Sequence, residues 1–288
     1  MKGRILGAVL LCGMVLAVAI GCSNNADSTN NTGNVSNISN TSNTGIAISP
    51  SGMTGMEILA KSDNVSINSM QVDTVMRVDA ANSWISMNFT KRVSMGGNIS
   101  NRQMYMTVTS SDMPNSNSSM YAVNGWVYVS EPGTKLKWVK TKLTDDIWNE
   151  DFGAGANLGL MGMVADAKYL GMENIGGINC YKIDITFDLV ALLNATGMSD
   201  FAGENSSLQD MFKGTLYIVW VAENTYYPAK MIIDMKTHQV EIETQTLSMS
   251  MYMRITYSNV NQPIAVILPA AAQKATAISY ATYKSGVW

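Results

Sequence analysis

The stretch YAVNGWVYV, residues 121–129, places the dipeptide Asn124-Gly125 between two runs of β-prone side chains. A type I′ turn needs a positive φ angle at both of its central residues, and Asn followed by Gly tolerates that geometry best. Asn-Gly between such runs is therefore the strongest short-range signal of a β-hairpin. The stretch predicts two antiparallel strands joined by a two-residue turn.

Alternation of apolar and polar residues with a period of two extends this pattern over most of the body. Strands are predicted at 71–79, 103–109, 137–141, 168–173, 180–187, 215–221, 227–236 and 240–257. Short turns join them, and we place His238 in or beside one such turn, Lys236-Thr237-His238-Gln239. Because a helix does not follow each strand, the order favours an antiparallel meander over βαβ units.

Three of these segments have one apolar face and one polar face. The apolar faces consist of Val72, Thr74, Met76 and Val78 in 71–79, of Met104, Met106 and Val108 in 103–109, and of Leu247, Met249, Met251, Met253, Ile255 and Tyr257 in 240–257. Alternate side chains of a strand point to the same side of a sheet. Each set is therefore expected to face the interior.

Two interruptions, 144–166 and 188–213, have helical character. The first opens with Thr144-Asp145-Asp146, which are good N-cap and first-turn residues. Short amphipathic helices set between the halves of a sheet are expected to cover its concave side. The predicted fold class is α+β, mainly β: a strongly curved antiparallel sheet that forms an unclosed half-barrel, with short helices covering the concave face.

The N-terminus has the features of a lipoprotein signal peptide. Lys2 and Arg4 precede an apolar run over 5–20, and Gly21 stands directly before Cys22. We expect cleavage after Gly21 and a lipid on the Cys22 thiol, which would tether the mature protein to the extracytoplasmic side of the cell membrane. An ordinary cleaved signal and an uncleaved anchor are the alternatives, although about 16 apolar residues fall short of the roughly 20 that span a bilayer.

Composition divides the chain after the signal peptide (1–21) into three parts. Residues 22–52 are almost wholly Asn, Ser, Thr and Gly, a composition that cannot offset the entropy of ordering and predicts a disordered stalk. Residues 53–270 are enough to bury a core of their own and predict one globular domain. Residues 271–288 are expected to form a short helix followed by a loose end.

The residue types of most catalytic and metal sites are scarce in this sequence. The chain has one histidine, His238, and Cys180 is the only thiol left in the mature body, which is too few for a nucleophile–histidine pair or a zinc site. The acidic residues of 145–151 are expected to cap a helix. A formal net charge of −3 offers no basic field for nucleic acid. We expect no enzymatic activity, no cofactor, no metal and no nucleic-acid partner.

Methionine is the strongest anomaly of composition, with 22 among 288 residues. Its side chain is unbranched and polarisable and adapts to varied apolar shapes. The methionines on strand faces therefore either fill a core or line a wall that accepts an apolar ligand. Copper(I) held by thioethers is a weaker alternative, because soft sulfur prefers that ion but no Cys or His accompanies these methionines.

Three segments of the body resemble the superfamily of LolA-like and LppX/LprG-like exported lipoproteins and lipoprotein-sorting proteins. They are residues 120–140, with the hairpin and the strand after it, residues 169–182, with the pattern G-x-E-x-h-x-G-h-x-C/A-Y, and residues 217–231, with Tyr227-Pro228-Ala229-Lys230. The resemblance covers nearly all of 53–269. It implies an unclosed antiparallel β-barrel whose lipid-sized apolar cavity is plugged by helices, in proteins that carry acyl chains, glycolipids or other apolar molecules between envelope layers. Cys22 departs from the soluble carrier of that superfamily and favours a tethered holder, receptor or short-range transfer protein.

The sequence thus predicts a monomeric, membrane-tethered lipoprotein that binds an apolar ligand, an acyl lipid or a lipoprotein acyl chain, for holding or transfer. The expected ligand-lining residues are Val72, Met76, Met104, Met106, Val108, Leu160, Met163, Met249, Met251, Met253 and Ile255. The alternative is a surface sensor or protein-interaction domain with a closed, ligand-free core. It would contact an envelope protein through exposed aromatic residues such as Trp126 and Trp138.

Overall fold

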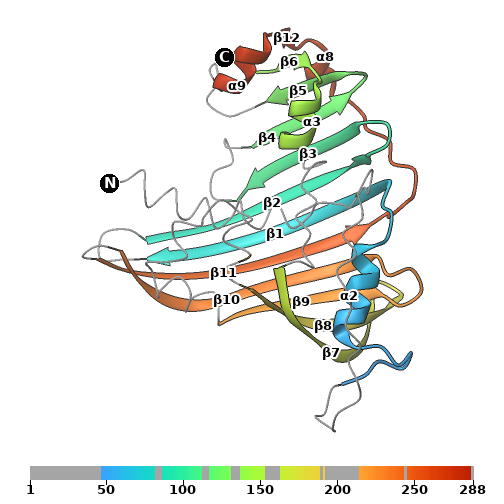
Figure 1. The fold of residues 1–288 in the computed structure, drawn as a ribbon. Coiled ribbons are helices and arrows are strands. Elements are labelled where there is room, and N and C mark those ends of the chain that lie inside the picture. The colour runs from blue at the N-terminus through green and yellow to red at the C-terminus, as the bar shows by residue number, and fades with distance from the viewer. Residues whose placement is uncertain are drawn as a thin grey trace.

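A single sheet of 12 strands makes up the body of the protein (Figure 1). The computed structural model describes residues 47–81, 86–111, 117–130, 137–152, 163–188, 191, 214–242 and 245–286. The strands follow the order β12-β6-β5-β4-β3-β2-β1-β11-β10-β9-β8-β7, and all neighbours are antiparallel except β12 and β6. The two ends of this order do not pair with each other. The sheet is therefore an open half-barrel, as predicted.

The strands and helices have the following bounds. The strands are β1 (Ser69–Ala81), β2 (Ser86–Asn98), β3 (Gln103–Ser110), β4 (Ser118–Val123), β5 (Trp126–Ser130), β6 (Val139–Lys142), β7 (Val164–Ile175), β8 (Ile178–Phe187), β9 (Thr215–Ala222), β10 (Pro228–Ile242), β11 (Gln245–Ser258) and β12 (Thr276–Ala277). The helices are α2 (Gly55–Asp63), α3 (Asp145–Asp151), α8 (Ala270–Gln273) and α9 (Tyr280–Ser285). No helix of the described residues is long and apolar enough to cross a membrane.

The predicted hairpin at 121–129 is confirmed. Val123 pairs with Trp126 across the turn between β4 and β5. Asn124 and Gly125 have φ angles of 53° and 74°, which are the positive values that a type I′ turn requires. The strands predicted at 71–79 and 103–109 are confirmed as parts of β1 and β3.

The end of β10 corrects the prediction for 236–257. Residues 240–242 complete β10 rather than begin the next strand, because Ile242 pairs with Gln245 to close the hairpin with β11. His238 does not lie in or beside a turn. Met235 pairs with Met251 and His238 with Met249, so that β10 contains one more residue than β11 at this point. Such a β-bulge shifts the period-two pattern, which is why the sequence suggested a break.

Strand β2 was missing from the predicted set, although it pairs with β1 and β3 along most of its length. Its alternation runs through Phe89, Val93 and Met95. Lys91 interrupts this apolar series, and Gly96-Gly97 lowers the strand propensity at the other end. The pattern is visible in the sequence once a single charged residue is allowed on the inward side.

The C-terminal residues are not a loose end. The short helix was expected and is confirmed as α8, but Thr276–Ala277 then adds a parallel strand beside β6. In α9, Tyr283 is buried among the residues of β5 and β6, and its hydroxyl donates to the Asp151 carboxylate of α3 at 2.5 Å. The tail therefore extends the sheet and packs against it.

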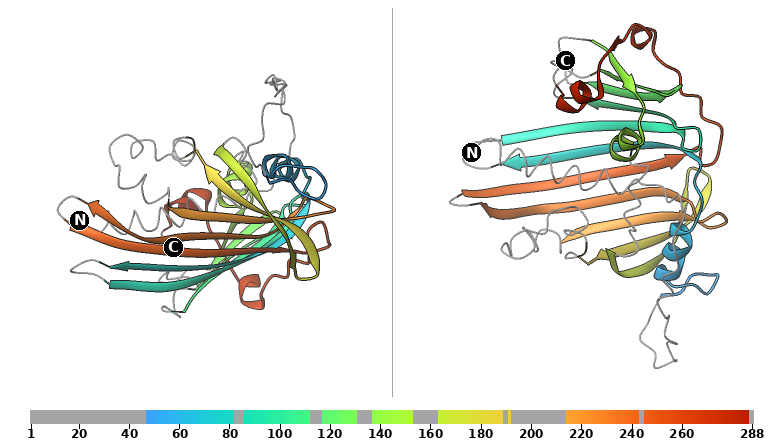
Figure 2. Two further views of the ribbon diagram at one scale, coloured as in Figure 1. Left: turned by 90° about the horizontal axis from the view of Figure 1, so that it is seen from below. Right: turned by 45° about the horizontal axis from the view of Figure 1, so that its top comes forward.

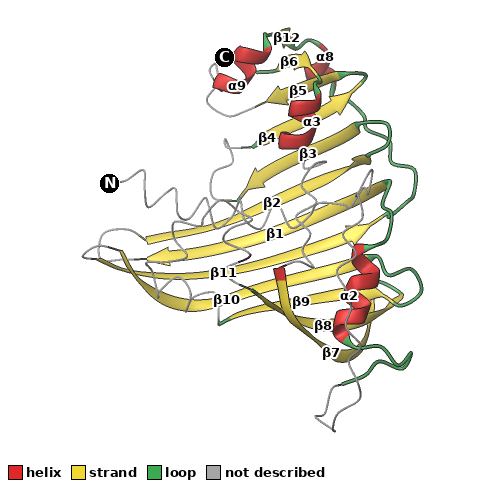
Figure 3. Ribbon diagram, in the orientation of Figure 1, coloured by secondary structure: helices red, strands yellow, loops and turns green. Residues whose placement is uncertain are grey.

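The sheet has an inner face, on which the helices pack, and an outer face. Figure 2 shows β7 and β8 turned at a steep angle to β10 and β11, so that the inner face is curved. Figure 3 shows the described helices near the two ends of the sheet: α2 lies beside β7, β8 and β9, and α3, α8 and α9 lie beside β4, β5 and β6. Between these ends, β1, β10 and β11 present the largest apolar cluster of the molecule.

Helix α2, which the sequence analysis did not predict, begins at a capping box and sits directly on the backbone of β7. Thr54 and Glu57 form a reciprocal capping box, in which Thr54 N–H donates to Glu57 Oε2 at 2.7 Å and Glu57 N–H donates to Thr54 Oγ1 at 3.3 Å. A side chain on Gly55 would clash with the carbonyl of Ala167. Only glycine therefore allows the helix to approach β7 this closely, with Ile58 and Leu59 buried beneath it.

The helical segments expected to cover the concave face are described only in part. Helix α3 and its N-cap Thr144 confirm the start of the first segment, and Asp145 and Asp146 occupy its first turn as expected. Residues 153–162, including Leu160, and most of 188–213 lie outside the described residues. Helices over the middle of the inner face therefore stay a prediction.

Candidate apolar binding face

The inner face brings most of the predicted lining residues together. Val72, Met249, Met251, Met253 and Ile255 are buried in one cluster, and Met76 packs against it. The strand registers place them side by side, since Met76 pairs with Met253 and Val72 with Tyr257 across β1 and β11. Strands β1 and β11, which lie near opposite ends of the domain's sequence, thus build one surface.

The other predicted lining residues lie elsewhere. Met104 belongs to a second cluster with Val127, Trp148 and Tyr283 under α3 and α9. Met106 and Val108 are half-buried on the inner side of β3. Met163 is buried at the start of β7, where its carbonyl accepts the backbone N–H of Asp188 at 2.7 Å. The two clusters show that the inner face has a large central part and a smaller part beneath α3 and α9.

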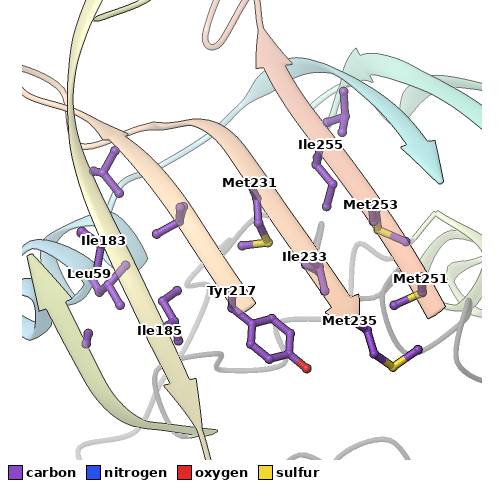
Figure 4. Close-up of a cluster of buried hydrophobic side chains, with 14 of the residues drawn as sticks. Leu59, Ile183, Ile185, Tyr217, Met231, Ile233, Met235, Met251, Met253 and Ile255 are labelled. Atoms are coloured by element: carbon purple, nitrogen blue, oxygen red, sulfur yellow. The ribbon is translucent and has the colours of Figure 1, made fainter. Parts of the chain in front are cut away.

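Sequence reasoning did not assign the half of the apolar face that β8, β9 and β10 supply. Its buried residues are Tyr181, Ile183, Ile185, Tyr217, Val219, Val221, Met231, Ile233 and Met235. Figure 4 shows Met231, Ile233 and Met235 beside Met251, Met253 and Ile255 on one side of the sheet. Tyr217 makes an edge-on contact with Phe187, with ring centroids 4.9 Å apart. These strands were predicted, and their alternation would also have identified the inward side.

Three polar side chains interrupt the apolar face near the end of β3. Lys91 pairs with Met76 of β1 and with Ser110 of β3, so all three point to the inner side. Thr74 lies two residues before Met76 on the same face. Thr74 and Ser110 are only 5% and 8% exposed, and neither hydroxyl has a hydrogen-bond partner among the described residues. Unpaired buried hydroxyls are uncommon in folded proteins.

The outer face of β3–β6 carries a surface of a different kind, the aromatic–lysine surface. It consists of Tyr105, Tyr121, Trp126, Tyr128, Trp138, Lys140 and Lys142. The Lys142 ammonium lies 4.1 Å from the centroid of the Trp126 ring, and Tyr121 and Trp138 have centroids 6.0 Å apart. Burial, followed by the neighbouring Tyr105, raises the pKa of Tyr121. The surface is therefore neutral or positive in the physiological range.

Cys180 lies on the outer side of β8, in a small cluster with Ile218, Trp220 and Ala229. It is a free thiol and fully buried. Burial raises the pKa of this thiol, so the reactive thiolate is scarce near neutral pH. Cys180 lies within the strand predicted at 180–187, which is confirmed as part of β8. Among the described residues there is no group of three His, Cys, Asp or Glu side chains that could hold a metal ion.

Comparisons with known proteins found one family model and several similar structures. A model of a family of unknown function, DUF6612, matches residues 195–277, and no curated protein matches the sequence. The lipoprotein LppX of Mycobacterium tuberculosis is similar in structure at 16% identity and a TM-score of 0.42, over 74% of this chain and 97% of that one. LprF of Mycobacterium bovis is similar at 16% identity and a TM-score of 0.40, over 75% and 97% of the two chains.

A LolA superfamily protein of Nitrosomonas europaea is a third similar structure. It has 16% identity and a TM-score of 0.25, over 75% of this chain and 96% of that one. The chain is similar to LolA-like and LppX-like proteins. These are the proteins that the sequence segments around 120–140, 169–182 and 217–231 resemble.

Proposed function

We propose that this protein is a non-enzymatic lipoprotein, tethered outside the cytoplasm through a lipid on Cys22, that binds an apolar ligand on its inner face for holding or transfer. The observation that carries the proposal is the methionine-rich apolar surface of β1, β10 and β11. Three methionines of β11 and two of β10 line one side of the sheet, and Met235 pairs directly with Met251.

The chemistry of this surface suits an acyl chain. Flexible thioether side chains adapt to a ligand whose shape varies along its length. Burial of apolar surface supplies the affinity, and each methylene removed from water contributes about 0.8 kcal/mol. A segment of about ten methylenes would thus contribute about 8 kcal/mol before the cost of association, which is enough for stable retention.

The test is to identify what the protein carries when it is purified. The full chain, with a C-terminal affinity tag, is extracted gently in a mild detergent and measured by native and denaturing mass spectrometry. We expect one acyl lipid per protein molecule. A protein mass without lipid, together with no uptake of a fluorescent fatty acid, would contradict the proposal.

A second candidate function is supported by the aromatic–lysine surface. Aromatic residues are enriched at protein interfaces, and the outer face of β3–β6 gathers two Trp and three Tyr rings with two lysines. A sensor or interaction domain would use this face to bind an envelope protein, with its own side chains filling the core. The full chain would then retain a stoichiometric protein partner without any lipid, and the double substitution of Trp126 and Trp138 by Ala would abolish retention by at least about tenfold. Unchanged retention would contradict this candidate.

A further inference from the structure

Lys91 is the only charged residue at an inward position of β1, β2, β3 and β11. The alternation of β2 places Phe89, Lys91, Val93 and Met95 on the inner face. The same registers place the acidic residues of β1, Asp73 and Asp79, on the outer face. A lysine at the border of an apolar surface is costly unless its ammonium finds an anion or water.

Among the described residues, no carboxylate is paired with Lys91. The side chain is half-buried, and its ammonium lies 5.7 Å from the centroid of the Phe89 ring. The ammonium is therefore available to a group that is not part of the described protein.

Two buried hydroxyls lie next to this lysine. Ser110 is directly opposite Lys91 in the β2–β3 pair, a position at which the Cβ atoms are about 5 Å apart. Thr74 is diagonal to Lys91 across β1 and β2. Both residues are more than nine-tenths buried, and within the described part of the chain neither hydroxyl has a hydrogen-bond partner. Ser110 therefore faces the lysine directly, whereas Thr74 lies on the other side of β2 and away from Phe89, the residue beside the ammonium.

We propose that Lys91 and Ser110 bind the acid group of an anionic amphiphile whose acyl chain lies on the methionine-rich face. The inference rests on the proposed function and specifies its ligand class: a lipid with a carboxylate or phosphate head. The ammonium pairs with the anion, and the Ser110 hydroxyl donates a hydrogen bond to one of its oxygens.

The path of the chain follows from the strand registers. From Lys91 the paired residues run through Met76 of β1, Met253 of β11 and Ile233 of β10 to Tyr217 of β9. Four steps between neighbouring strands span about 19 Å, a length comparable to the extended acyl chain of a common fatty acid. The row is apolar from Met76 to Ile233 and ends at the phenol of Tyr217, so Lys91 is its one charged position.

The position of Lys91 also suits a head group that reaches the solvent. Strand β3 ends at Ser110, whereas β2 extends beyond this pair to Ser86. Lys91 therefore lies at the end of the paired part of β2 and β3. An acid group bound to the half-buried ammonium can contact the solvent there, while the acyl chain of the ligand stays on the apolar face.

The experiment compares an acid with its uncharged analogue. The full chain is kept soluble in a neutral amphipathic polymer and titrated with cis-parinaric acid and with its methyl ester, followed by fluorescence. Dioleoyl phosphatidic acid and dioleoylglycerol serve as unlabelled competitors, and inorganic phosphate as an anion without a chain. We expect the wild type to prefer each acid over its neutral analogue by at least about tenfold.

The variants assign this preference to Lys91. Lys91→Gln should remove the preference while leaving ester binding unchanged, and Lys91→Arg should retain most of it. Arg92→Gln removes a positive charge one residue away on the outer face and should change nothing. Ser110→Ala should weaken acid binding two- to threefold while keeping or raising Tm, because it removes a buried hydroxyl that lacks a partner.

The outcomes separate this inference from the proposed function. Equal binding of acid and ester by the wild type, or an unchanged preference in Lys91→Gln and Ser110→Ala, would overturn the head-group site and leave the apolar-ligand proposal standing. Competition by inorganic phosphate alone would overturn the amphiphile and indicate a simple anion site. If neither parinaric probe binds, the proposed function fails, and this inference fails with it.

Discussion

Gly97→Ala is expected to lower the free energy of unfolding by about 3 kcal/mol or more, an effect at the upper end of overpacking. A Cβ atom at Gly97 would clash with the Gln103 carbonyl, and it would lie 2.6 Å from Met104 Cα and 2.8 Å from Met104 Cγ. Two of these contacts are with backbone, which cannot move without opening the β2–β3 ladder. That ladder joins the central apolar cluster to the one beneath α3 and α9.

Gly96→Ala is the matched control, since it makes the same chemical change one residue away. A Cβ atom there would lie 2.9 Å from the Tyr105 ring and from its hydroxyl. These atoms belong to the far end of a half-buried side chain on the outer face, which can turn aside. We expect a loss of about 1 kcal/mol or less, because replacing glycine in a strand also favours folding.

Chemical unfolding of both variants, followed by circular dichroism of the full chain, measures the difference. Wild type and variants are compared at one protein concentration in the same detergent. Equal and small losses of stability in the two variants would show that β3 does not lie as close to Gly97 as the structure places it. Equal and large losses would instead point to the flexibility of the Gly96-Gly97 pair as the feature that the fold requires.

Met251→Trp is expected to reduce the acyl lipid that co-purifies with the protein by at least about tenfold. Met251 is 5% exposed and lies between Val78 of β1 and Met235 of β10 on the inner face. The indole of Trp is larger and stiffer than the thioether and would occupy the surface that we assign to the ligand. A loss of about 1.4 kcal/mol in binding already corresponds to a tenfold effect.

Ser250→Trp is the control on the same strand. Ser250 pairs with Asp79 and therefore faces the outer side of the sheet, where an added ring does not meet the ligand. The lipid content of both variants is measured by mass spectrometry, and their Tm values are measured in parallel. If Met251→Trp lowers Tm but leaves lipid uptake unchanged, the inner face is filled by its own side chains, and the binding proposal fails.

Local patterns predicted much of the fold because they depend on neighbouring residues. The hairpin at Asn124-Gly125 follows from the φ angles that those two residues tolerate. The inward face of β11 follows from period-two alternation, since Met249, Met251, Met253 and Ile255 are all buried. The same logic failed at β2, where Lys91 breaks the apolar series, and at His238, where a bulge shifts the period.

The candidate site depends on contacts that such patterns do not contain. Alternation in the sequence shows which side chains share a face of one strand, because that is a property of each extended backbone. Only the folded sheet shows that β1 lies between β2 and β11, which brings Lys91 and Ser110 to one end of a row that crosses Met76 and Met253. Strand pairing between distant segments is set by the burial of the whole face. For that reason the sequence could predict that the methionines point inward, but only the tertiary structure shows that Lys91 lies at one end of their apolar row.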